Sequence, residues 1–137
     1  MRTENTLNKL VVIFQNLTQI ESSSVETNLS ESYFLKSVNT ELREIIMVCY
    51  LNTDLLAVGR YIKEEYKGEY YSLVYSKIND LKKNINKNLK VIQSVSGYIK
   101  DSNCRRYIKD AVRHVDALLL SIDKSMETFT AARNHMH

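Results

Sequence analysis

The sequence predicts an all-α protein, an antiparallel up-down-up-down four-helix bundle that forms oligomers. Apolar residues recur at spacings of three and four along most of the chain, as they do on one face of a helix. The 137 residues include no proline and only 3 glycines, so few residues interrupt long helices. The alternation of apolar and polar residues that is typical of strands is missing.

Size and composition indicate one helical-bundle domain over residues 1–137. A chain of this length buries a core without metals or disulfides, and its 2 cysteines cannot form a disulfide framework. The longest uninterrupted apolar run, Ile45 to Leu51, is too short to cross a bilayer, so no transmembrane segment is expected. With no secretion signal recognised, we expect the protein in the reducing cytoplasm.

The first helix is expected over about residues 4–20, with Thr3 or Thr6 as its cap. Its apolar residues share one helical face: Leu7, Leu10, Phe14 and Leu17. Residues 21–30 are rich in serine, threonine and asparagine, which compete for backbone hydrogen bonds and indicate a loop.

The second helix is expected over about residues 31–67, as one long element or as two with a kink near Gly59. Polar Asn52 interrupts its inward positions, which are Leu35, Val38, Leu42, Ile45, Cys49 and Leu56. Gly68 is expected to end it, because glycine readily adopts the left-handed conformation of a helix C-cap.

The third and fourth helices are expected over about residues 69–99 and 104–133. The third keeps an apolar heptad with only Asn88 out of place, and Leu89 can fill that layer. The fourth has apolar inward positions from Ile108 to Ala132, with polar Ser125 as the exception. Short turns at 67–69 and 100–104 then predict antiparallel neighbours.

The middles of three helices hold more apolar residues than one bundle needs on its inward stripes. An apolar surface of this kind marks an interface, most simply in a symmetric homodimer. The alternative is a second helix that is buried all round in an irregular packing. The residues assigned to this interface are Val12, Met47, Val48, Leu51, Leu119 and Leu120.

Basic residues are concentrated in one part of the chain. Residues 77–114 hold 10 basic and 3 acidic residues, a net charge of +7, against +3 for the whole chain. With the heptad isoleucines inward, the outer faces of the third and fourth helices present Lys83, Lys87, Lys90, Arg106, Lys109 and Arg113. Such a surface attracts phosphate backbones in a salt-dependent manner, although it can also be a solvated face that keeps the protein soluble.

No catalytic constellation is recognised, and no enzyme activity, cofactor or metal is expected. Glu41 and Glu44 have the spacing of metal ligands, but no histidine follows, so both are expected on the surface. The residues beside Cys104 are Arg105 and Arg106, which can lower a thiol pKa, and a reactive cysteine is a minor alternative.

These patterns predict a non-catalytic interaction protein, an accessory or adaptor subunit whose basic surface engages nucleic acid or another anionic partner. The alternative is a protein-only adaptor or inhibitor that acts through the apolar interface residues or through the tyrosines around Gly68. A third hypothesis places a small-molecule pocket at Asn52, Asn88 and Ser125, although buried polar residues more often fix helix register.

Overall fold

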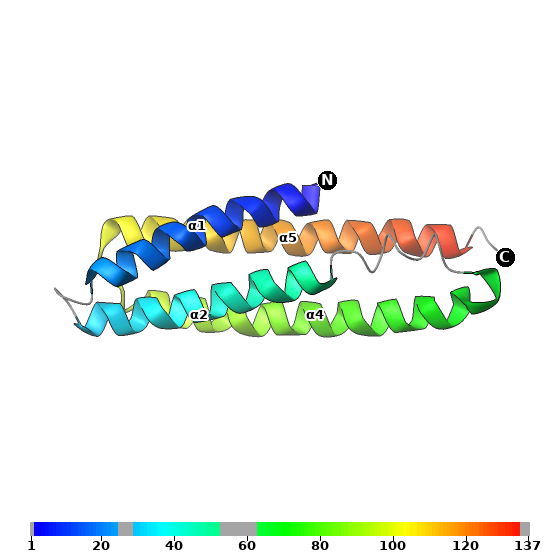
Figure 1. Cartoon of the computed structure of the whole chain (residues 1–137), viewed down its shortest axis with the longest axis horizontal. Coiled ribbons are helices and arrows are strands. Elements are labelled where there is room, and N and C mark those ends of the chain that lie inside the picture. The colour runs from blue at the N-terminus through cyan, green and yellow to red at the C-terminus, as the bar shows by residue number, and fades with distance from the viewer. Residues whose placement is uncertain (1, 25–28, 53–62, 135–137) are drawn as a thin grey trace.

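The computed structural model describes residues 2–24, 29–52 and 63–134, and nearly all of them are helical. The long helices are α1 (Arg2–Ser24), α2 (Leu29–Asn52), α4 (Lys67–Ser96) and α5 (Ser102–Asn134), with a short 3-10 helix η2 (Glu64–Tyr66) before α4. Figure 1 shows the four long helices side by side along the long axis of the molecule. No strand occurs in these ranges, which confirms the all-α prediction.

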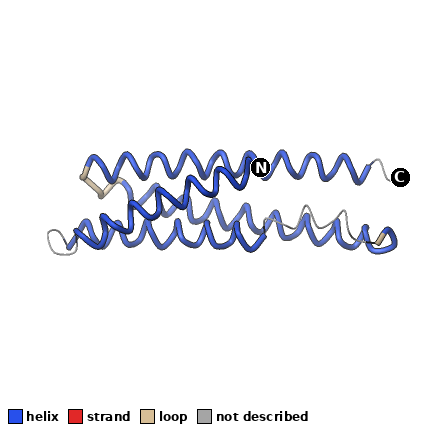
Figure 2. Tube along the Cα trace, turned by 45° about the horizontal axis from the view of Figure 1, so that its top comes forward, coloured by secondary structure: helices blue, strands red, loops and turns tan. Residues whose placement is uncertain are grey.

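The helices pack as a closed set, with α1 against α2 and α5, α2 against α4, and α4 against α5. Early residues of one helix meet late residues of the next: the Tyr50 hydroxyl of α2 donates to Asn8 Oδ1 of α1 at 3.3 Å. Likewise Tyr75, near the start of α4, and Thr130, near the end of α5, form a hydrogen bond with each other. Figure 2 shows the turn between α4 and α5, in tan, at one end of the molecule.

The core is built from the inward positions of all four helices. Among the most completely buried side chains are Leu7, Leu10, Leu17, Leu35, Val38, Leu42, Ile45, Val74, Ile85, Ile92, Ile99 and Leu118. Phe14, predicted to be inward, is only half-buried, whereas Ile13 beside it is buried. Cys49 and Asn88 are buried as their heptad positions predict.

The boundary predicted at Gly68 is wrong. The structure describes α2 to Asn52, and the predictions on Leu56 and Gly59 lie outside the described residues. Gly68 does not end a helix but lies in the first turn of α4, after Tyr66 N donates to Lys63 O at 2.9 Å. The apolar periodicity that resumes at Tyr71 extends the helix back over this glycine, which has no positive φ.

The turn between α4 and α5 has a defined cap. Asp101 Oδ2 accepts a hydrogen bond from Cys104 N at 2.9 Å, and Arg105 N donates to Asp101 O at 3.0 Å. This is the geometry of an N-cap residue, and it lowers the pKa of the Asp101 carboxyl because the bond from Cys104 N favours the charged form. Across the turn, Lys100 N donates to Glu31 Oε1 at 2.7 Å, which ties the turn to the start of α2.

Replacing Gly68 tests its placement inside α4. A Cβ atom added there meets nothing within 4 Å. Gly68→Ala should therefore raise the free energy of unfolding by about 0.5–1 kcal/mol, because alanine loses less backbone entropy on folding. Urea denaturation measures the change. A loss of stability would instead indicate that residue 68 needs the left-handed conformation of a C-cap.

Replacing Asp101 tests the cap. Asp101→Ala should lower the free energy of unfolding by about 1 kcal/mol, whereas Asp101→Asn keeps a capping oxygen and most of the stability at neutral pH.

The wild type and Asp101→Asn should differ in how their stability changes at acidic pH. Because folding lowers the pKa of Asp101, its charge stabilises the fold above the usual value of 3.8 and loses this effect as the pH falls through the folded value. The wild type should therefore lose stability more steeply in that range than Asp101→Asn, as followed by thermal denaturation. Asp80→Asn, at an exposed residue of α4, is the matched control. Identical acid profiles for the wild type and Asp101→Asn would contradict this assignment.

Candidate anion-binding surface

The predicted basic residues lie on the solvent side of α4 and α5. Burial of Ile78 and Ile85 fixes the rotation of α4, and a residue five positions later lies on the opposite side of the helix. On α5, the burial of Ile108 and Val115 has the same effect. All the predicted side chains are exposed: Lys83, Lys87, Lys90, Arg106, Lys109 and Arg113.

The two basic helices are neighbours. They are joined by the turn after Gly97, and Lys82 bridges them through its ion pair with Asp123. Tyr75 and Thr130 hydrogen-bond to each other between the same helices. The exposed lysines of α4 and the basic residues of α5 therefore lie on adjacent helices. Lys82 is half-buried where the two helices meet, and its charge is already paired with Asp123.

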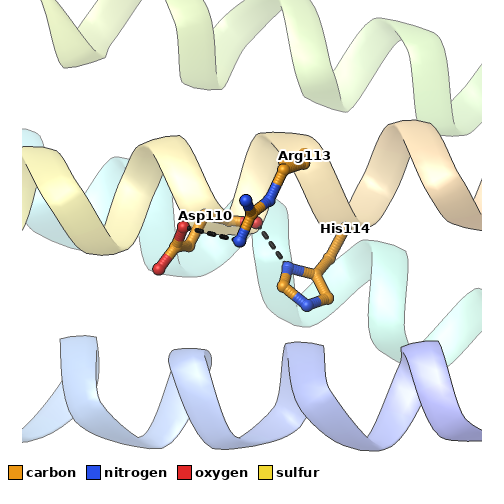
Figure 3. A network of polar contacts seen from close by, with 3 residues as sticks. All are labelled: Asp110, Arg113 and His114. Carbon is orange, nitrogen blue, oxygen red and sulfur yellow. Dashed lines mark hydrogen bonds and ion pairs between the residues drawn. The ribbon is translucent and has the colours of Figure 1, made fainter.

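One member of the set is partly neutralised. Arg113 Nη2 lies 3.1 Å from Asp110 Oδ1, and His114 Nδ1 lies 2.6 Å from the Asp110 carbonyl oxygen (Figure 3). The Arg113 side chain is 75% exposed, so this pair adds little stability and its guanidinium stays accessible to solvent. Asp110 therefore reduces the positive charge at this point of the surface.

Arg106 lies at the other end of the α5 set, near the turn. Its guanidinium carbon is 5.6 Å from the ring centroid of Tyr107, within the range of a cation–π contact. Tyr107 is half-buried and packs against the core. This contact favours a position of the Arg106 guanidinium close to the protein surface.

The apolar interface residues are distributed over three helices. Val12 is 55% exposed and Leu51 is 79% exposed, and Met47 and Leu120 are also exposed. Val48 and Leu119 are half-buried and pack against the core. Because α2 exposes Met47 and Leu51 in the single chain, the alternative of a second helix buried all round is wrong.

The proposal of a low thiol pKa at Cys104 is wrong. Cys104 is buried, and burial raises its pKa to about 12, with the Asp101 carboxyl as a second cause in the same direction. Burial also raises the pKa of Cys49 to about 12. The neighbouring arginines are exposed, and neither offsets the effect of burial on the Cys104 pKa. In the described ranges, no group of three or more His, Cys, Asp or Glu could hold a metal ion.

A partly buried polar contact joins α2 to α4. Asn88 Nδ2 donates to Glu41 Oε2 at 2.5 Å and to Glu44 Oε2 at 2.9 Å. Glu41 is half-buried and Glu44 is exposed, so only Glu44 fits the surface position predicted for both. The contact gives Asn88 partners from the protein itself, which supports a register-fixing role over a ligand-binding one.

An aromatic cluster that the sequence does not predict lies beside the α4–α5 turn. The rings of Phe34 and Tyr98 stack with centroids 5.0 Å apart and an interplanar angle of 16°. The rings of Tyr33 and Phe34 are nearly perpendicular, with centroids 5.8 Å apart. The contact joins residues far apart in the chain, and the only local signal was the pair of adjacent aromatic residues at 33 and 34.

Changing Asn88 tests the α2–α4 contact. Asn88→Asp places a third carboxylate against Glu41 and Glu44 and removes the donor, which should lower the free energy of unfolding by about 1–3 kcal/mol. Asn84→Asp adds the same charge at an exposed position of α4 and should change stability by less than about 0.5 kcal/mol. Urea denaturation compares the two variants, and equal losses would contradict the contact.

Comparison with models of protein families, with curated proteins and with solved structures finds no match to this chain. None of the helices in the described ranges has the length and apolar character needed to cross a membrane.

Proposed function

We propose that this protein is a non-catalytic accessory or adaptor subunit, an antiparallel up-down-up-down bundle whose basic surface on α4 and α5 binds nucleic acid. The observation that carries the proposal is the set of exposed cations on adjacent helices. Within the described residues, only Arg113 of this set forms an ion pair. The proposal places the protein in the cytoplasm, in keeping with two free buried cysteines.

The chemistry favours a polyanion over a single small anion. Lys83 and Lys90 are seven residues apart, which corresponds to about 10 Å along a helix. Cations spread over such a length match a phosphate chain, which carries a charge about every 3.4 Å of each strand. Each lysine supplies a point charge without base recognition, so the contacts are backbone-directed.

Fluorescence anisotropy with labelled DNA and RNA in a salt series tests the proposal. Binding of the wild type should weaken log-linearly with salt, because the protein releases counterions from the phosphates. Replacing Lys83, Lys87 and Lys90 with glutamate should reduce the magnitude of the salt slope for a duplex by about 2–3, at about 0.9 per lost phosphate contact. Affinity at low salt should fall in the same variant.

The matched control changes three basic residues elsewhere. Lys9, Arg43 and Lys63 are exposed and lie outside α4 and α5, and their replacement by glutamate changes the net charge by the same amount. This control should retain most of the salt slope. Equal losses of salt slope in both variants would show that the effect comes from net charge alone. No binding by the wild type at low salt would reject the proposal.

The second candidate is a protein-only adaptor or inhibitor, in which the apolar interface residues contact a different protein rather than a second copy of this chain. Val12 and Met47 support it. A hydrogen bond joins Asn8 of α1 to Tyr50 of α2. Val12 lies one helical turn from Asn8, and Met47 lies one helical turn from Tyr50. Both exposed side chains therefore lie along the α1–α2 contact. Light scattering distinguishes the two kinds of partner: a stable multimer favours self-association, and a monomer without nucleic-acid binding favours a different protein partner.

The tyrosines around Gly68 are the other surface predicted for a protein partner. Of these, Tyr66 is exposed, Tyr71 is buried and Tyr61 lies outside the described residues.

A further inference from the structure

The aromatic cluster of Tyr33, Phe34 and Tyr98 lies at the end of the bundle where α4 turns into α5. Phe34 is half-buried and packs against the core, so it anchors the cluster. Tyr98 stacks on one face of the Phe34 ring and is 64% exposed, and Tyr33 is 68% exposed. Because Phe34 covers one face of the Tyr98 ring, the exposed area lies on its other face and its edge.

The turn holds Tyr98 in place. Tyr98 N donates to Val95 O at 3.0 Å, and two residues later Lys100 N donates to Glu31 Oε1 of α2. The backbone on both sides of the ring is therefore fixed by hydrogen bonds. A ring fixed in this way loses little conformational entropy when a planar group stacks on it.

Basic residues outnumber acidic ones in the chain around this turn, where the Glu31 carboxylate of α2 accepts the hydrogen bond from Lys100 N. Residues 97–109 include four basic residues and one acidic residue, Asp101. The Asp101 carboxylate is engaged in the cap of α5, and Arg105 and Arg106 are exposed. Arg106 also belongs to the basic surface described above, and it lies in the second turn of α5, shortly after the turn that carries Tyr98.

We propose that this aromatic cluster makes the basic surface selective for single-stranded nucleic acid. An unpaired base stacks on the free face of Tyr98, while Lys100, Arg105 and Arg106 contact the flanking phosphates. An exposed aromatic face beside cations is the arrangement that binds single strands without sequence preference. A duplex keeps its base faces stacked inside, so it reaches the cations without using the ring. This inference rests on the proposed function and adds the class of nucleic acid.

The experiment compares an oligodeoxythymidylate of about 12 nucleotides with a duplex of similar length, by anisotropy at low salt. Tyr98→Ala should weaken binding of the single strand by about 5-fold to 150-fold, the range for loss of one stacked base, and leave duplex binding unchanged. Tyr98→Phe should bind like the wild type, since the ring face remains. Tyr66→Ala, at an exposed tyrosine before α4, should leave both affinities unchanged.

The outcomes separate this inference from the proposed function. Duplex binding by the wild type with no effect of Tyr98→Ala on the single strand would overturn the inference and leave the basic surface intact. No binding of either probe would reject the proposed function itself. A change of molar mass in Tyr98→Ala, with single-strand affinity retained, would overturn the inference by assigning the ring to a protein contact. If circular dichroism shows that Tyr98→Ala loses helix, Tyr98→Leu replaces it with the same expectation.

Discussion

The removal of one apolar stripe per helix from water is the constraint on which the rest of this structure depends. Each fully buried leucine or isoleucine contributes about 1.5–3 kcal/mol, so the stripes determine how every helix is rotated. On α4, burial of Ile85 and Ile92 leaves Lys83 and Lys90 no position except the solvent side. The charge distribution of the surface is therefore a consequence of the core.

Polar contacts between neighbouring helices refine an arrangement that the apolar stripes already favour. Asn88 is held between two carboxylates of α2, and Asn39 donates to Glu21 Oε1 of α1 at 2.8 Å. Apolar layers tolerate small sliding of one helix along another, whereas these amides lose their partners when a helix shifts by one turn. Such contacts specify helix register more than they add stability.

The helices and most inward positions could be predicted because helical periodicity is a local property of sequence. Gly68 differs from its predicted place because the apolar periodicity that resumes at Tyr71 outweighs the preference of glycine for helix ends. The pKa of the Cys104 thiol could not be predicted, because the sequence shows the adjacent arginines, whereas burial and the Asp101 cap depend on the fold. The basic residues were predicted as exposed, but the stacking of Phe34 on Tyr98 required knowledge of how α2 meets the turn.

The two buried thiols give the molecule internal reporters of its own opening. A thiol in its native position is shielded from alkylating reagents and holds its proton, so modification proceeds through open states. Cys104 lies in the first turn of α5, where fraying of a few residues is enough to expose it. Cys49 lies in the last described turn of α2 among core residues, so its modification requires that part of α2 to leave the core. The two alkylation rates therefore compare opening at the start of α5 with opening of the late part of α2.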